Sequence, residues 1–179
     1  PTYIIKSNLM KKIEIKKLNV NKDITKKYHR WMNDFEILKF TEQDYKKHSL
    51  SDIKKFIKDK NKSKNEFVYG IFLKEKNTNN HIGNIKLGPI NNIHKTADIS
   101  YFIGEKNLWG KGYSTIAINK IIKIAKKKGV KKLAAGHYEM NIGSGKVLKK
   151  NGFKLEGVFK SEIVFKNKRY STFRYGLIL

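Results

Sequence analysis

A short glycine-containing segment carries the clearest chemical signal in this chain. The segment 109–115 (WGKGYST) separates an apolar, β-branched run at 97–103 from a run with helical spacing of isoleucine and alanine. A glycine turn that feeds a helix leaves the first backbone N–H groups of the helix without intrahelical partners. Those donors and the positive end of the helix dipole suit a phosphate. Gly112 also permits a close backbone approach, so the segment predicts a site for a phosphorylated ligand.

A second pattern begins at Asn141 (NIGS) and continues into a helical run that carries Val147 and Leu148 and stops at Asn151-Gly152-Phe153. Asn141 is a good N-cap for that helix, and Ser144 would then stand at its third position, where hydroxyls are also comfortable. A hydroxyl at the start of a helix can also act on a bound ligand. Capping and chemistry both remain open for Ser144.

These two patterns, with a strand-length segment at 131–137 between them, resemble the acetyl-coenzyme A core of the GNAT N-acetyltransferases. The resemblance is closest to the RimJ/RimL-like branch, where W-G-x-G-Y-x-T and N-x-x-S-x-x-V-L-x-K-x-G-F recur together. It is tightest over 82–158 and extends more loosely back to Lys11 and forward to the C-terminus. It implies an α+β fold: one GNAT domain whose mixed, mostly antiparallel sheet is flanked by helices, with splayed central strands that hold the cofactor.

The resemblance implies that acetyl-CoA is the cofactor. Its pantetheine arm would pair with the backbone of the strand at 97–103, and its pyrophosphate would bind the amides of the glycine turn. Trp109 stands where the wider family has glutamine or arginine, and it matches the narrower branch. Ser114, at the last position of the wider motif, is a small departure. The residues expected to bind the cofactor are Phe102, Ile103, Gly104, Trp109, Gly110, Lys111, Gly112, Tyr113, Ser114, Thr115, Asn141, Ser144 and Lys150.

Acetyl transfer to nitrogen needs an uncharged amine and an exit for the thiolate. Many GNAT enzymes protonate the thiolate with a tyrosine slightly later in the second helix. Here Val147 and Leu148 occupy those places, so Ser144 becomes the candidate acid. Histidine titrates in the range suited to a base, and His94 is expected near the open side of the central strand. His137, Asp98 and Glu105 are weaker candidates.

Four residues are expected on the acceptor side of the site. The stretch around Trp31 and Asn33 (WMND) matches the region that covers the acceptor in the resembled enzymes, although its aromatic residues also suit a helix packing face. His94 and Tyr138 complete the set. The segment 83–90 (GNIKLGPI), followed by His94 and by Ala97-Asp98-Ile99, resembles GNAT enzymes that acetylate nucleotide-linked amino sugars for bacterial surface polysaccharides.

Two alternatives to an amino-sugar acceptor stay open. One is RimJ/RimL-like acetylation of a protein N-terminus, and the other is a basic RNA- or ribosome-associating module without catalysis. The formal charge is +25, yet all but three of the 40 basic residues are lysines. Arginine is the better bidentate phosphate reader, so nucleic-acid binding is not favoured. The charge would still repel a polycationic acceptor and attract a nucleotide-bearing one.

Composition excludes several other classes. The 179 residues include no cysteine, which removes disulfides and thiolate catalysis and fits a cytoplasmic enzyme. No apolar run approaches the ~20 residues of a membrane helix, and no His/Asp/Glu spacing suggests a metal. We expect one domain over 1–179, in which 1–10 is a tag or disordered leader because Pro1 cannot initiate translation. The sequence leaves an oligomer open.

The elements that must position these residues follow from periodicity and capping. Strands are expected at 13–16, 67–73, 82–87, 97–103, 131–137, 155–165 and 171–178. Besides the two helices already described, the pattern predicts a helix at 25–32 and another that Ser51-Asp52 caps. A polar loop is expected at 58–65 and a turn at 88–92.

Overall fold

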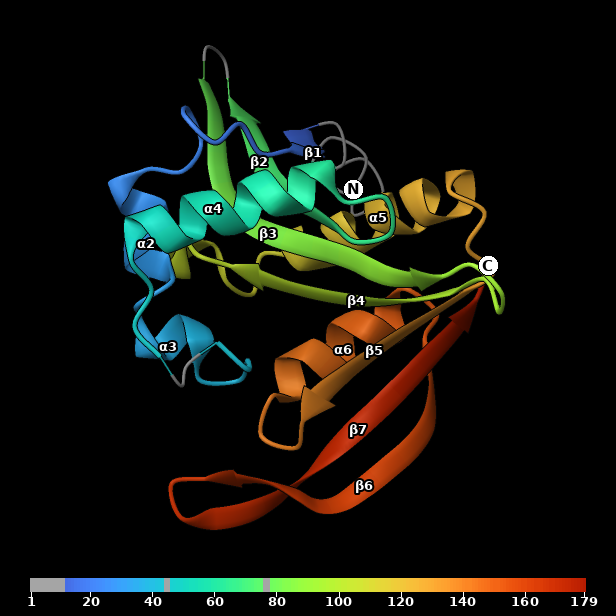
Figure 1. Ribbon diagram of the computed structural model, residues 1–179. Coiled ribbons are helices and arrows are strands. Elements are labelled where there is room, and N and C mark those ends of the chain that lie inside the picture. Colours follow the sequence, from blue (N-terminus) through green and yellow to red (C-terminus); the bar gives the residue numbers. More distant parts are fainter. Residues whose placement is uncertain (1–11, 44–45, 76–77) are drawn as a thin grey trace, which may run out of the picture.

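The structure is a computed structural model that describes residues 12–43, 46–75 and 78–179 (Figure 1). The expected leader at 1–10 lies outside the described residues. Along the chain the elements are β1 (Ile13–Lys17), α2 (Lys26–Trp31), α3 (Phe35–Leu38), α4 (Leu50–Lys62), β2 (Phe67–Glu75), β3 (Thr78–Asn91), β4 (Thr96–Ile103), a 3-10 turn η1 (Lys106–Leu108), α5 (Tyr113–Lys127), β5 (Lys132–Tyr138), α6 (Ile142–Lys150), β6 (Lys154–Phe165) and β7 (Lys168–Ile178).

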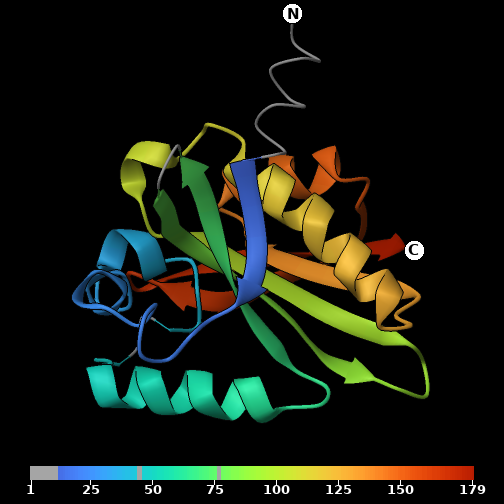
Figure 2. The same ribbon diagram turned by 90° about the horizontal axis from the view of Figure 1, so that it is seen from above.

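The seven strands form one sheet in the order β1-β2-β3-β4-β5-β7-β6. Every neighbouring pair is antiparallel except β4 and β5, which are parallel. Helices cover both faces: α5 lies on one side of the strands and α4 on the other (Figure 2). The predicted α+β fold with a mixed, mostly antiparallel sheet is confirmed.

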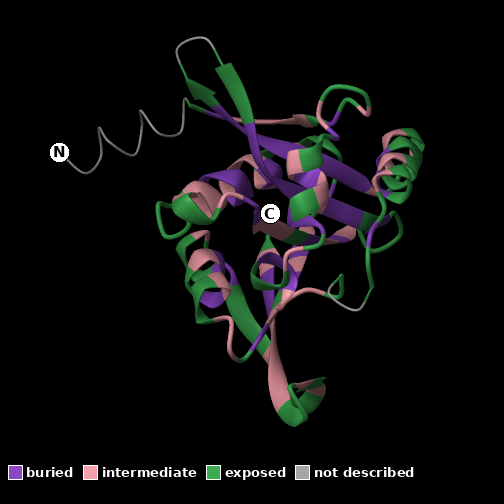
Figure 3. Cartoon of the chain, turned by 90° about the vertical axis from the view of Figure 1, so that its left-hand side faces the viewer, coloured by how far each residue is buried: buried purple, intermediate pink, exposed green. Residues whose placement is uncertain are grey.

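Apolar residues separate into two cores, one on each face of the sheet. The larger core joins α5 and α6 to the strands, and Ile116, Ala117 and Ile121 supply the buried stripe of α5. The smaller core lies beneath α2, α3 and α4 and includes Trp31 and Ile57. Burial is therefore concentrated in β2, β3, β4 and β5 and on the inner stripes of the helices, whereas β6 is exposed or half-buried along its length (Figure 3).

The parallel strands β4 and β5 pair only over Thr96–Asp98 and Lys132–Ala134. From residue 99 onward β4 keeps β3 as its neighbour but has no ladder to β5. At a rise of about 3.3 Å per residue, residues 99–103 give β4 an unpaired edge of about 16 Å. We call this opening between the C-terminal halves of β4 and β5 the wedge. It is the predicted splay of the central strands.

The structure differs from the local expectations at four points. Ser49, not Ser51-Asp52, caps α4: its Oγ accepts from the Asp52 amide at 3.1 Å and donates to the Asp52 carboxylate at 2.6 Å. The helix then continues to Lys62, through part of the expected loop, because lysine is a good helix former and Ile57 keeps its inner face buried. The short α3 was not predicted, and β3 extends to Asn91, which moves the turn to 92–95.

Candidate active site

The glycine turn has the backbone geometry of an anion cradle. Gly110 and Gly112 have φ of 75° and 86°, the left-handed region that residues with a Cβ rarely adopt. A Cβ added at either glycine would meet no atom within 4 Å, so space, rather than crowding, lies on that side of the backbone. Gly112 is also the N-cap of α5 and supplies no side-chain acceptor. The first amides of this 15-residue helix are therefore available to a ligand, and the turn fits a pyrophosphate.

The turn is tied to the end of β4 by a tryptophan. Trp109 Nε1 donates to the Ile103 carbonyl at 2.8 Å, which fixes the turn relative to the wedge. Lys111 is exposed, and Tyr113, Ser114 and Thr115 are half-buried in the first turn of α5. Lys150, also expected to bind the cofactor, is exposed at the opposite end of α6 from Asn141.

The predicted pairing of β4 with a pantetheine arm needs a correction of register. The Gly104 amide donates to Ile82 of β3 at 2.8 Å, and the Phe102 carbonyl points at Gly83 of β3. Because backbone polar groups alternate sides along a strand, those of Tyr101 and Ile103 face the wedge instead. The Ile103 carbonyl already accepts the Trp109 indole. Tyr101 is thus the residue of β4 whose backbone is best placed for the arm, and sequence reasoning did not select it.

Ser144 is held at the mouth of the wedge. The Asn141 side chain accepts from the Ser144 amide at 3.3 Å, so Asn141 is the N-cap of α6. The Ser144 Oγ lies 2.8 Å from the hydroxyl of Tyr101 on β4. Capping therefore belongs to Asn141, and the Ser144 hydroxyl is directed across the wedge.

His137 supports α6 from below rather than facing the cleft. Its ring stacks on Phe173 and Tyr175, with centroids 5.2 and 5.5 Å away, and its Nδ1 lies 2.8 Å from the Tyr138 carbonyl. Its Nε2 is buried without a hydrogen-bond partner against Gly145 of α6. This ring sets how closely α6 approaches the sheet. The sequence shows that Gly145 falls inside the expected helix, but it does not show that this glycine contacts His137.

His94 does not lie where the sequence suggested. It is exposed in the turn between β3 and β4, and its amide donates to the Asn91 side chain at 2.9 Å. That turn joins the end of β4 where β4 and β5 are still paired. The wedge opens toward the other end of β4, and the glycine turn follows that end, about 20 Å away along the strand. The expectation that His94 lies near the open side of the central strand is wrong.

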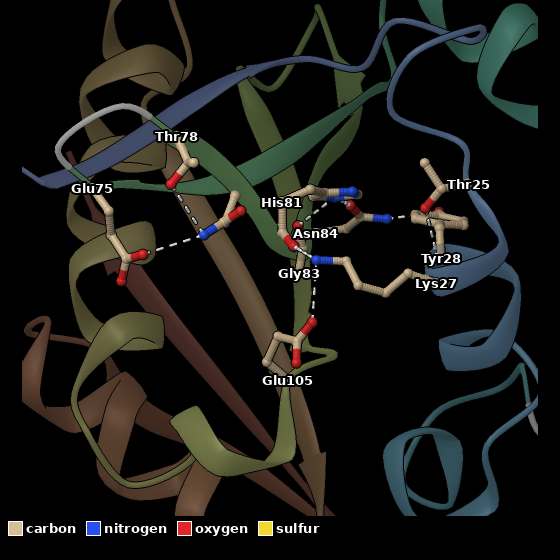
Figure 4. A network of polar contacts seen from close by, with 10 residues as sticks. Thr25, Lys27, Tyr28, Glu75, Thr78, His81, Gly83, Asn84 and Glu105 are labelled. Atoms are coloured by element: carbon tan, nitrogen blue, oxygen red, sulfur yellow. Dashed lines mark hydrogen bonds and ion pairs between the residues drawn. The ribbon is translucent and has the colours of Figure 1, made fainter.

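Trp31 is buried at the end of β4, where its ring covers Gly104. A Cβ on Gly104 would lie 2.1 Å from that ring, so only glycine allows this contact. Beside it, a polar network joins α2 to β3 (Figure 4). Asn84 donates to the Tyr28 hydroxyl at 2.7 Å and accepts from His81 Nε2 at 2.8 Å. Burial raises the pKa of Tyr28 to about 12 and lowers that of His81. These contacts fix α2 to the sheet.

The same network reaches the loop after β4. Lys27 Nζ donates to the His81 carbonyl at 2.7 Å and lies 3.2 Å from Glu105 (Figure 4). Glu105 is therefore paired with a lysine in the loop that follows β4. The network and the Trp31–Gly104 contact together position the strand end that leads into the glycine turn.

The remaining predicted acceptor residues lie near the loop after α3. The side chain of Asn33 forms three hydrogen bonds to backbone groups: it donates to the His29 and His48 carbonyls at 2.9 Å and accepts from the His48 amide at 3.0 Å. It shapes the loop. The Tyr138 hydroxyl at the end of β5 donates to Glu42 in that loop. Tyr138 therefore lies on the face opposite α5 and α6, bordering the wedge.

An ion pair on that same face marks the point where the wedge begins. Asp98 is the last residue of β4 that pairs with β5, and its carboxylate accepts from Arg174 of β7. The guanidinium passes over Gly136 of β5, which has no side chain to obstruct it. Both side chains remain about half exposed. Of the acidic candidates, Asp98 is the one placed at the wedge.

The sequence profile described as Acetyltransferase (GNAT) domain matches residues 13–154, most of the chain. The chain belongs to the GNAT acetyltransferase family. It is an N-acetyltransferase that uses acetyl-CoA, and GNAT relatives of known structure are seen with acetyl-CoA or coenzyme A bound. The glycine turn and the wedge are the parts of this GNAT domain that fit the cofactor. No curated protein matches the sequence.

Solved GNAT structures share this fold at low identity. Spermidine N-acetyltransferase from Vibrio cholerae, with coenzyme A and spermine, has a TM-score of 0.82 at 18% identity and covers 94% of this chain and 96% of its own. RimL, a ribosomal L7/L12 alpha-N-protein acetyltransferase with coenzyme A, has 0.79 at 18%, covering 94% of each chain. The microcin C7 self-immunity acetyltransferase MccE, with acetyl-CoA and AMP, has 0.75 at 23%, covering 94% and 93%.

Among the described residues, none of the helices combines the length and the apolar character needed to cross a membrane.

Proposed function

We propose that this GNAT enzyme acetylates the amine of a nucleotide-linked amino sugar. The observation that supports the proposal most directly is the Asp98–Arg174 pair beside exposed Ser100, on the sheet face opposite the cofactor helices. A half-exposed carboxylate, guanidinium and hydroxyl offer both acceptors and donors to sugar hydroxyls and to an amine. The chain's net charge of +25 favours an anionic carrier over a polycationic acceptor.

Aromatic side chains border the same face. Phe35 of α3 and Phe165 at the end of β6 stack with centroids 6.3 Å apart, and Phe40 lies 6.2 Å from Phe165. Lys166, in the turn between β6 and β7, has its Nζ 5.8 Å from the centre of the Phe35 ring. Aromatic faces suit sugars and bases, and lysines suit a diphosphate as point charges. This border extends the acceptor surface away from the wedge.

The proposed mechanism assigns each face of the sheet one task. Acetyl-CoA supplies an acetyl thioester. The amides of the glycine turn and the backbone of Tyr101 hold and orient it, as the resemblance implies. On the opposite face Asp98 takes the proton of the attacking amine, directly or through water, as the nitrogen–carbon bond forms. When the carbon–sulfur bond breaks, the Ser144 hydroxyl donates a hydrogen bond to the leaving sulfur.

The test is an acetyl-CoA-dependent mass gain of one acetyl group across nucleotide-linked amino sugars that differ in the amine position. A diphosphate acceptor should also show a salt-dependent apparent affinity, because lysines supply much of its attraction. Acetylation of peptide N-termini, with none across the sugar panel, would overturn the proposal. Asp98→Asn should lower kcat at unchanged coenzyme A affinity, and unchanged kcat would remove Asp98 as the base.

A protein N-terminus is the second candidate acceptor. The fold is shared with RimL, whose name describes alpha-N-protein acetylation. Glu42 and Asp98, which lie on the acceptor face, would suit an α-ammonium group. A peptide acceptor lacks the diphosphate, so its apparent affinity should respond little to salt. Salt dependence and the two acceptor panels together separate the candidates.

A further inference from the structure

Tyr101 is the residue that joins the two walls of the wedge. It lies on the unpaired half of β4. Its ring lies on the same face of the strand as the buried Ile99 and Ile103, the face that α5 and α6 cover. Its hydroxyl reaches α6, 43 residues later in the chain, at 2.8 Å from Ser144 Oγ. It also lies 3.4 Å from the Ser144 carbonyl. No feature of the glycine turn or of the N-x-x-S pattern points to this tyrosine.

The surroundings decide what this contact can do. Asn141 already caps α6, so the Ser144 hydroxyl is free of that duty. Burial raises the pKa of Tyr101 to about 12. A free thiol of the cysteine type has a pKa near 8.5, so a phenol of this kind does not surrender its proton to a thiolate at neutral pH. Tyr101 therefore stays neutral and keeps its proton, so its hydroxyl can donate a hydrogen bond.

We propose that Tyr101 is a positioning residue that donates to Ser144 Oγ and so directs the Ser144 hydroxyl proton to the sulfur of coenzyme A. The donor chain runs from Tyr101 through Ser144 to the sulfur. It stabilises the thiolate when the carbon–sulfur bond breaks, and no proton leaves Tyr101. Hydrogen bonds in such a chain polarise one another, so loss of the first weakens the second. The inference rests on the proposed role of Ser144, and it replaces the helix tyrosine of other GNAT enzymes by one on β4.

The test is the pKa of the thiol of bound coenzyme A, read from the ultraviolet absorbance of its thiolate. The chain has no cysteine, so the cofactor supplies the only thiol, and protein saturated with acetyl-CoA serves as the reference. Tyr101→Phe keeps the ring and removes only the hydroxyl. The thiol pKa should rise by about 0.5–1 pH unit, the scale of one hydrogen bond between neutral groups, while calorimetry shows coenzyme A affinity within about twofold.

Two further variants make the result specific. In Ser144→Ala the thiol pKa should rise at least as much, and adding Tyr101→Phe should raise it no further, because Tyr101 acts through Ser144. Tyr69→Phe on β2 is the matched control: Tyr69 is also buried, burial also raises its pKa, and the described structure shows no hydrogen bond from its hydroxyl. That variant should leave the thiol pKa unchanged.

Each outcome has one meaning. An unchanged thiol pKa in Tyr101→Phe, with a shift in Ser144→Ala, overturns the role of Tyr101 and leaves the proposed role of Ser144 standing. Additive shifts show that Tyr101 acts independently of Ser144, which also overturns the inference. If Ser144→Ala changes nothing, the proposed role of Ser144 fails first. Loss of coenzyme A binding with a lowered Tm in Tyr101→Phe alone would make Tyr101 part of the scaffold.

Discussion

The packing of α6 against His137 gives a prediction in which the magnitude of the effect follows from a distance in the structure. A Cβ added to Gly145 would lie 2.6 Å from His137 Nε2, whereas non-bonded carbon and nitrogen atoms prefer about 3.5 Å. The His137 ring cannot yield easily, because Phe173 and Tyr175 stack on it. In Gly145→Ala we therefore expect α6 to move outward by about 0.9 Å.

That displacement should break the contact between α6 and β4. The Tyr101–Ser144 distance of 2.8 Å would become about 3.7 Å if the helix moves as a body, beyond hydrogen-bond range. Overpacking of this kind costs about 1–3 kcal/mol, partly offset by up to about 1 kcal/mol from the better helix propensity of alanine. The same-helix control Gly143→Ala meets only the Asn141 side chain, at 3.9 Å, and keeps the propensity gain.

Two quantities are measured for both variants: the Tm of thermal unfolding and the pKa of the thiol of bound coenzyme A. The difference between the variants isolates the contact, and at about 2 kcal/mol it lowers the Tm of Gly145→Ala by about 4–8 °C relative to Gly143→Ala. The thiol pKa should rise in Gly145→Ala alone. Equal Tm values together with equal thiol pKa values would refute the reasoning, since α6 would then rest on something other than this ring.

Three further predictions concern the turn and the buried network. Gly112→Val should abolish coenzyme A binding in calorimetry, while the circular dichroism spectrum stays native. The reason is that φ of 86° disfavours a β-branched residue and that the new side chain would fill the open space at the turn. Unchanged affinity for coenzyme A would mean that the phosphate binds elsewhere. Tyr28→Phe leaves the Asn84 amide without its acceptor, costing about 1–3 kcal/mol, and should lower Tm where Tyr69→Phe does not. Because burial lowers the pKa of folded His81, the unfolded chain binds more protons below the ordinary histidine pKa of ~6.5. The contribution of His81 to the free energy of unfolding should thus be fully present above that pH and should be lost as the pH drops below it. His81→Gln should flatten the decline of Tm between about pH 7 and 5. An equally steep decline in that variant would show that His81 is not its cause.

Local signals in the sequence predicted what depends on neighbouring residues. A glycine turn ahead of a helical stripe predicted the start of α5, and the positive φ of Gly110 and Gly112 is compatible with that turn. The cap of α6 by Asn141 likewise needs only the next three residues. Strand spacing and the family resemblance gave the sheet, including the splayed pair.

Contacts between distant segments were beyond such signals. Periodicity places Tyr101 on a strand and Ser144 on a helix, but their hydrogen bond depends on where β4 and β5 separate. His94 was misplaced for the same reason: a turn of unpredicted length put it at the paired end of β4. His137 was one of the weaker candidates for the base, and its place under Gly145 depends on β7 rings 36 and 38 positions later.

The sequence by itself determined that this chain has a glycine turn ahead of a helix and a capped second helix, because each is a local preference of the backbone, and these two patterns indicated the family. Only the tertiary structure brings Tyr101 to Ser144 and Asp98 to Arg174, the contacts on which the proposals for the sulfur and for the amine rest. Asp98, Arg174 and Gly136 come from three different strands, and the sheet order makes them neighbours. Packing and register, which involve the whole chain at once, decide those contacts, and no short stretch of residues carries that information.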